Sequence, residues 1–261
     1  MEIGWHQLAA SGALIAVAVV LSVWKGLDVE RSILIASLRA AVQLIAVGLV
    51  FTVIFESAAA VLWGVVWVVG MTVVSAEIVN RRTPGIPSVR VAAYLSLGGA
   101  LVVSLGLVFG LGIFEFEPVT LVVLAGITLG NTLPSAVLAV NTASQAFTDS
   151  PGRIEAALAL GLDADQVNRL LVPRAVRTAL IPQIERTKVV GLIALPGAMT
   201  GMLLAGADAL SAVMVQVVIM YLILGSVATV VVVVVTAIGT RAFTRDFRLA
   251  EWVVAGDGAA D

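Results

Sequence analysis

Residues 211–239 read SAVMVQVVIMYLILGSVATVVVVVVTAIG, and no side chain in this run is charged. A helix needs about 20 mostly apolar residues to cross the hydrocarbon core of a bilayer, so the run is long enough to span a membrane. Its Val230 to Val235 stretch would also suit a buried strand of a soluble protein. The length of the run and the lack of strand-spaced turns favour a helix, because backbone groups in lipid must pair within their own segment.

Outward from this run, six further segments are long and apolar enough to cross a membrane. Together the seven predicted spans are 7–24, 33–54, 58–79, 91–113, 118–141, 188–207 and 211–239. The composition agrees, since 60% of the 261 residues are hydrophobic, only 12% are charged, and the mean hydropathy is +1.09. A soluble domain carries about a quarter charged residues. We therefore predict an all-α membrane protein, a polytopic helical bundle formed by one transmembrane domain over residues 1–261.

The basic residues predict the orientation of the bundle. Lysine and arginine concentrate in cytoplasmic loops, and all of them except Arg39 fall in alternate connections, whereas the other connections hold only acidic charges. Seven spans then place the N-terminus outside and the C-terminus in the cytoplasm, in the plasma (inner) membrane. The N-terminal residues lack the basic region of a cleavable signal peptide, so we expect the first apolar run to be a retained span.

The one long loop, at about 142–187, is predicted to be cytoplasmic and to contain two short helices. Its start and stop signals are, in order, Ser150 as N-cap with Pro151 at the first helical position, Gly161 as a helix stop, Asp163 to Gln166 as a capping box, then Pro173 and Pro182 as breaks. Each signal satisfies or removes backbone donors and acceptors at a helix end. The sequence therefore predicts a helix–turn–helix that projects from the membrane.

This loop resembles the EAA loop of ABC-transporter permeases. Glu155, Ala156 and Ala157 are followed by Gly161 and, after an apolar Leu-Leu-Val, by Pro173. The spacing to the proline is about one residue short of the usual pattern, and Val172 stands where leucine is common. The resemblance implies a lever that docks on a separate ATPase. The alternative is an amphipathic helix pair that lies on the lipid headgroups.

A longer stretch resembles the FetB-type permeases, a family that includes bacterial iron exporters and plant aluminium-tolerance permeases. The segments that carry the resemblance are 174–182 (RAVRTALIP), 188–201 (KVVGLIALPGAMTG), 206–208 (GAD), 216–220 (QVVIM) and 126–131 (GITLGN), with Arg39 and Gln43 upstream. Ala198 and Met202 depart from the pattern, which has Met and Gln there. Both positions flank the expected pathway, so the departures bear on the identity of the substrate.

Several residues are candidates for the translocation path. Pro196 and Gly197 interrupt the sixth predicted span, and a broken helix exposes backbone groups that a watered cavity can accept. A packing kink would explain the break equally well. Asn131 in the fifth span either faces the path or bonds a neighbouring helix, beside glycines spaced for close packing. The resemblance adds Met199, Thr200 and Gln216 to the path.

A polar group is also predicted inside the membrane near its inner side. Arg39 and Gln43 are four residues apart and share a helix face. A charge within a span needs a partner or water, and Glu77, near the inner end of the third span, is the expected ion-pair partner. The alternative is that Arg39 extends its side chain to the cytoplasmic surface. We expect this group to be structural.

Metal ligands cannot be assigned from the sequence. Met199, Met202, Met214 and Met220 are candidate soft-metal ligands, but methionine in apolar helices is more often packing material. Ferric iron prefers oxygen ligands, and few carboxylates lie in the spans. The chain has no cysteine and one histidine, His6, and it has no phosphate-binding loop. We therefore expect no cofactor and no catalytic residue in this chain, with ATP and magnesium on a partner subunit.

The leading hypothesis is a membrane-spanning permease subunit of an ABC transporter, an exporter of metal ions such as iron. It would act as a homodimer in the lipid bilayer with a separate ATPase, without nucleic acid and without enzymatic activity of its own. One alternative is a stand-alone secondary transporter or channel, which would need an ionisable coupling site in mid-membrane. Another is an ABC permease for a non-metal solute such as a nucleotide sugar.

Overall fold

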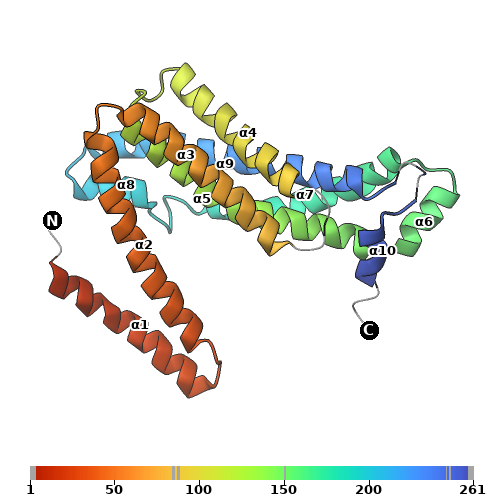
Figure 1. Ribbon diagram of the computed structural model, residues 1–261, viewed down its shortest axis with the longest axis horizontal. Helices are drawn as coiled ribbons and strands as arrows, with labels where there is room; N and C mark the ends of the chain where they lie inside the picture. The colour runs from red at the N-terminus through yellow and green to blue at the C-terminus, as the bar shows by residue number, and fades with distance from the viewer. Residues whose placement is uncertain are drawn as a thin grey trace. The chain divides into compact units, whose positions relative to one another are not determined.

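The computed structural model describes residues 4–83, 86, 89–149, 151–244, 246 and 248–257, and its regular elements are helices (Figure 1). Within these residues, five helices are long and apolar enough to cross a membrane, and a shorter apolar helix covers Ala10–Lys25. The protein is therefore a polytopic helical membrane protein. The chain consists of two compact units, Met1–Trp63 (unit 1) and Gly64–Asp261 (unit 2). The prediction of a single domain and that of the orientation stay predictions.

Unit 1 is a helical hairpin of α1 (Trp5–Lys25) and α2 (Glu30–Glu56). Gly26 ends α1 in the left-handed conformation, at φ 60°, which glycine adopts without steric cost. Ser22 then ties the turn together: its hydroxyl donates to Glu30 (3.0 Å) and accepts from the amide of Val29 (3.3 Å). The first two predicted spans are thus confirmed as helices.

Unit 2 is built around its longest helix, α9 (Ala209–Arg241). The helices that pack along α9 are α4 (Val89–Gly110), α5 (Pro118–Thr148), α7 (Ala164–Lys188) and α8 (Gly197–Leu204). The valine run that suggested a strand is helical, and Val230, Val231, Val234 and Val235 are almost completely buried. Helix α3 (Ala60–Arg82) contains the boundary between the units in its first turn, and a Cβ on its Gly64 would lie at van der Waals distance, 3.6 Å, from Cγ2 of Val122 in α5.

The prediction of a single helical span over 188–207 is wrong. Helix α7 ends at Lys188, and α8 has eight residues, which cover about 12 Å against a hydrocarbon core of about 30 Å. Gly191 is left-handed (φ 85°) and Pro196 precedes the first turn of α8, so the chain cannot continue as a helix between them. Instead α7, the connection and α8 together run along α9 in the opposite direction (Figure 1).

The two prolines of the long loop do not end helices. The first loop helix, α6 (Pro151–Ala159), is short as predicted, and Gly161 (φ 91°) follows it; Ser150, its predicted N-cap, lies outside the described residues. The capping box of α7 is confirmed, but α7 continues through both prolines for 25 residues. An internal proline costs about 3 kcal/mol, and burial against α5 and α9 offsets it. The buried positions lie four or eight apart: Val167, Ala175, Ala179 and Gln183.

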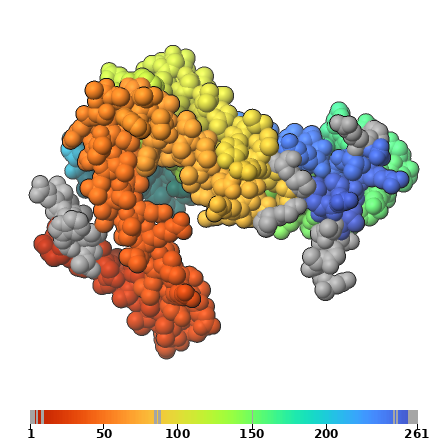
Figure 2. Space-filling view, in the orientation of Figure 1, coloured from red at the N-terminus to blue at the C-terminus, as the bar shows by residue number. Residues whose placement is uncertain are grey.

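One end of unit 2 carries a separate small core. The last turns of α5, the helix α6, the start of α7 and the C-terminal helix α10 (Glu251–Asp257) meet there. The buried members are Phe147, Ile154, Val167, Ala242, Leu249 and Val253. In Figure 2 the C-terminal segment, in blue, lies against the green surface of this end. The core fixes α6 to the end of the helix bundle.

Candidate functional site

The break before α8 is held by a side chain from α9. The amide of Met199 donates to Oε1 of Gln216 (3.3 Å), and the Thr200 hydroxyl donates to the carbonyl of Pro196 (3.0 Å). The first amides of a helix lack partners within it, so Gln216 acts as a cap supplied by a neighbouring helix. Only 5% of Gln216 is exposed. The structure thus brings together four of the predicted path residues, and Gly197 lies beside them in the first turn of α8.

Asn131, the remaining predicted path residue, lies apart from this group and contacts α7. Its Nδ2 donates to the carbonyl of Ile127 (2.7 Å), one turn earlier in α5, and its Oδ1 accepts from Nη1 of Arg186 (3.1 Å). Because Nδ2 is used within α5, the amide is oriented with its acceptor toward Arg186. Asn131 therefore links two helices, which is one of the two roles considered for it.

Sequence reasoning missed Arg186. It placed Arg186 and Lys188 in a cytoplasmic loop, whereas the structure places Arg186 beside Asn131, well inside the length of α5. Lys188 forms an ion pair with Glu185 at 2.7 Å. The signal was weak, because the apolar part of α7 is short and interrupted by two prolines. The position of these charges directly before the Val189 to Pro196 connection was the available clue.

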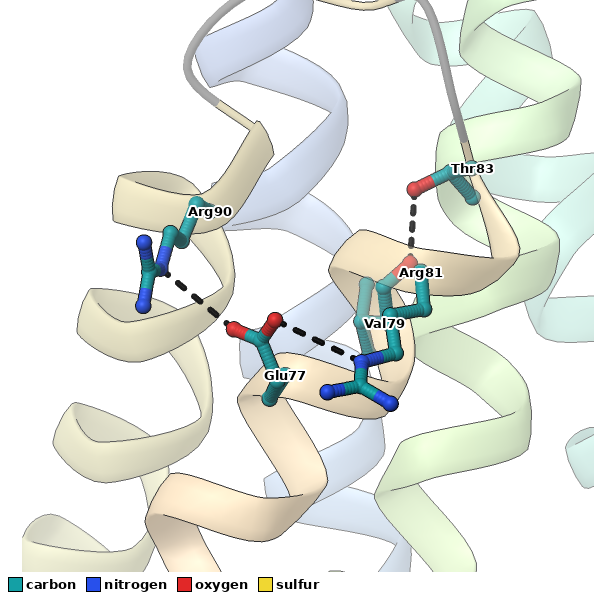
Figure 3. A network of polar contacts seen from close by, with 5 residues as sticks. All are labelled: Glu77, Val79, Arg81, Thr83 and Arg90. Atoms are coloured by element: carbon teal, nitrogen blue, oxygen red, sulfur yellow. Dashed lines mark hydrogen bonds and ion pairs between the residues drawn. The ribbon is translucent and has the colours of Figure 1, made fainter.

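Glu77 has two arginine partners (Figure 3). Its Oε1 lies 3.6 Å from Nε of Arg81, one turn later in α3, and its Oε2 lies 3.4 Å from Nε of Arg90 in α4. Oε2 is buried and makes no hydrogen bond within the described residues, so the approach of Arg90 is ionic. Glu77 is the bridging charge between the end of α3 and the start of α4.

Arg39 and Gln43 lie one turn apart on α2 in unit 1, and both are exposed there. The most apolar 18-residue stretch of α2 has no buried residue in the described structure. The pairing of Arg39 with Glu77 joins residues of different units and stays a prediction, although Glu77 is already neutralised by other arginines.

The predicted coupling residues lie in α6, in the turn that follows it and in α7. Ile154 (4% exposed) anchors this helix in the small core, while its neighbours Glu155 and Ala156 are exposed and Ala157 is half-buried. Leu160 follows with 83% of its surface exposed. Gly161 lies in the turn, and Pro173 is exposed inside α7. The helix thus has a fixed inner side and an accessible outer side with a carboxylate and a large apolar residue.

No group of three or more histidine, cysteine or acidic residues within the described parts of the chain could hold a metal ion. Among the four methionines considered, Met214 is 56% exposed, and Met199, Met202 and Met220 are half-buried. The described residues therefore show no cluster of hard ligands for a bare ferric ion.

Residues 5–243, most of the chain, match the model of the uncharacterised protein family UPF0014. The chain belongs to the UPF0014 family. Among its relatives is the UPF0014 membrane protein STAR2 of Oryza sativa subsp. japonica, 33% identical over 98% of this chain and 89% of that protein.

Two further relatives carry names of their own. The probable iron export permease protein FetB of Escherichia coli is 29% identical over 85% of each chain. The protein ALUMINUM SENSITIVE 3 of Arabidopsis thaliana is 28% identical over 97% of this chain and 93% of that protein. No solved structure matches the chain. The expected relationship to FetB-type proteins is thus confirmed.

Proposed function

We propose that this chain is the membrane-spanning permease subunit of an ABC transporter that exports metal ions, with iron as the model cargo. Two copies assemble with two copies of a separate ATPase, which holds ATP and magnesium. The relative named as a probable iron export permease supports the cargo and the direction.

The observation that carries the coupling role is the geometry of α6. A helix transmits force if one side is fixed to the moving bundle and the other side is free to dock. Ile154 supplies the fixed side within the small core, and Glu155, Ala156 and Leu160 form the free side. Movement of the ATPase would therefore reach α5 and α7 directly, since both contribute to the same core.

The coupling role is tested by co-purification of the chain with its ATPase. Glu155→Lys reverses a charge on the free side of α6, and Glu155→Lys with Gly161→Pro also removes the left-handed turn. We expect both variants to insert into the membrane but to lose the ATPase, the double variant completely. Asp246→Lys reverses another exposed charge near the C-terminus and should retain it. Undiminished co-purification of the double variant would rule out the coupling role.

A stand-alone secondary transporter is the second candidate, favoured by one observation. Glu185, Arg186 and Lys188 supply ionisable groups alongside the middle of α5, at the depth where such a transporter needs its coupling site. Export from cells or vesicles that lack the ATPase, driven by an ion gradient alone, would establish this function instead. We expect no such export.

A further inference from the structure

The contact of Arg186 with Asn131 lies inside the membrane. Helix α5 has 31 residues and is about 46 Å long, and Asn131 is about 20 Å along it from Pro118. A hydrocarbon core of about 30 Å, placed anywhere along this length, always covers the part from about 16 to about 30 Å. Asn131 and the arginine that contacts it therefore lie within the hydrocarbon layer, whichever end of α5 protrudes.

The charges beside this contact are exposed in the single chain. Glu185 and Lys188 are 59% and 63% exposed, and Arg186 is exposed as well. A charge that faces lipid at this depth costs about 3 kcal/mol on insertion scales, so such residues face protein or water instead. Three in one turn of α7 indicate that this side of α7 faces a watered path, alone or with a second copy of the chain.

The helix break lies directly beyond these charges. Helix α7 ends at Lys188, and the chain resumes a helix only at Gly197. Transporters bind their cargo near the midplane at such interrupted helices, because the freed backbone groups and nearby side chains can contact it. The charged turn and the break together therefore have the position of a cargo site.

The local charge determines which cargo fits. Glu185 and Lys188 form an ion pair at 2.7 Å and neutralise each other. The guanidinium of Arg186 donates to the uncharged side-chain amide of Asn131. The turn therefore carries one net positive charge. A bare metal cation would be repelled, and no acidic cluster in the described residues compensates. A guanidinium has five N–H donors, and its planar fork matches a carboxylate or phosphate.

We propose that Arg186, oriented by Asn131, is a cargo-binding residue, and that the metal reaches it as a negatively charged carboxylate chelate rather than as a free cation. This inference rests on the proposed permease function and names the chemical form of its cargo. Asn131 is a positioning residue, since it holds one guanidinium nitrogen and leaves the outer side of the fork for the oxyanion.

The test is equilibrium binding to the purified chain in phosphatidylcholine nanodiscs, without ATPase. Radiolabelled iron is offered as ferric citrate or as a ferrous salt without chelator. We expect the citrate complex to bind more tightly than the free ion. Arg186→Gln should weaken citrate-complex binding about 10- to 100-fold, the range for a charged hydrogen bond. Arg177→Gln changes an exposed arginine about two and a half turns earlier in α7, and it should leave the binding unchanged.

A second variant keeps the test decisive if Arg186→Gln does not fold. Asn131→Asp places a carboxylate against the guanidinium, which would compete with the chelate and weaken its binding without loss of an arginine. Tighter binding of the free ion than of the citrate complex, or equal chelate binding by wild type and a folded Asn131→Asp variant, would overturn the inference. Because the assay contains no ATPase, undiminished co-purification of the Glu155→Lys/Gly161→Pro variant would refute the proposed coupling role while leaving this binding result intact.

Discussion

Helices α7 and α9 pack against each other in unit 2, yet they differ in charge, in proline content and in continuity. Helix α9 is uncharged from Ala209 to Thr240 and buries most of one side, including its valine run. Helix α7 has two internal prolines, several charged residues and a break after Lys188. The difference indicates a division of roles: α9 is the fixed scaffold of the bundle, and α7 carries the polar groups and the force from α6.

The largest expected effect comes from separating these two helices. A Cβ on Gly239 of α9 would lie 2.8 Å from Oδ1 of Asn168 and 3.0 Å from Cγ2 of Val172, both in α7. Gly239→Leu should therefore destabilise unit 2 by about 3 kcal/mol, the upper part of the range for overpacking. Thermal unfolding in detergent measures the change. Gly225→Ala, on α9 with open space around it, should unfold no earlier than wild type, and equal loss in both variants would contradict the close contact.

The next prediction concerns the cap that α9 provides for α8. Gln216→Leu removes the acceptor of the Met199 amide and should cost about 1 kcal/mol, a typical value for a lost helix cap. Hydrogen exchange at Met199 should accelerate. Gln216→Glu keeps an acceptor and should retain most of the protection. If exchange is the same in wild type and the leucine variant, Gln216 does not hold the break.

The sequence alone predicts more of the structure of α9 than of α7. The run 211–239 needs no tertiary information, because its length and its lack of strand-spaced turns already favour a helix over a buried strand. Helix α7 was misread at Pro173 and Pro182, since the local cost of proline is visible in a sequence but the compensating burial of Ala175 and Ala179 is not. The capping box at Asp163, by contrast, depends on residues three apart and was read correctly.

The candidate site was predicted in pieces for the same reason. Pro196, Met199, Thr200 and Gln216 lie within the stretch that resembles the family, and the structure brings them together. Arg186 and Asn131 are 55 residues apart, and a charged residue beside a cytoplasmic-type loop does not by itself indicate a contact with the middle of α5. Only the packing of α7 on α5 reveals that contact.

A smaller effect is expected at the ion pairs of α3 and α4. Glu77→Gln and Arg90→Gln, singly and together, form a double-mutant cycle. Because Arg90 is 63% exposed, we expect a coupling free energy of only about 0.5 kcal/mol, as for other exposed pairs. The cycle of Glu77 with Arg39 tests the remaining sequence prediction. A larger coupling there than with Arg90 would make Arg39 the principal partner.

The smallest effect is expected at the N-cap of α9. Asp208 accepts hydrogen bonds from the amide (3.0 Å) and the hydroxyl (3.3 Å) of Ser211. The hydrogen bond from the amide is the main cause that lowers the pKa of this carboxyl below its usual 3.8. Its stabilising effect should be present above pH 3.8 and disappear as the pH falls through the lowered pKa. Asp208→Asn should make the unfolding temperature slightly less dependent on pH in this range. If the unfolding temperature of the Asp208→Asn variant depends on pH as strongly as that of wild type, the cap does not contribute to stability.

The comparison of α7 with α9 is tested most directly by water accessibility in the membrane. The chain has no cysteine, so single-cysteine variants can be labelled cleanly with a charged methanethiosulfonate reagent in proteoliposomes. Lys188→Cys lies at the charged turn, and Gly225→Cys lies near the middle of α9 on an exposed position. We expect rapid labelling of the Lys188→Cys variant and very slow labelling of the Gly225→Cys variant. Equally slow labelling of both would contradict a watered path along α7.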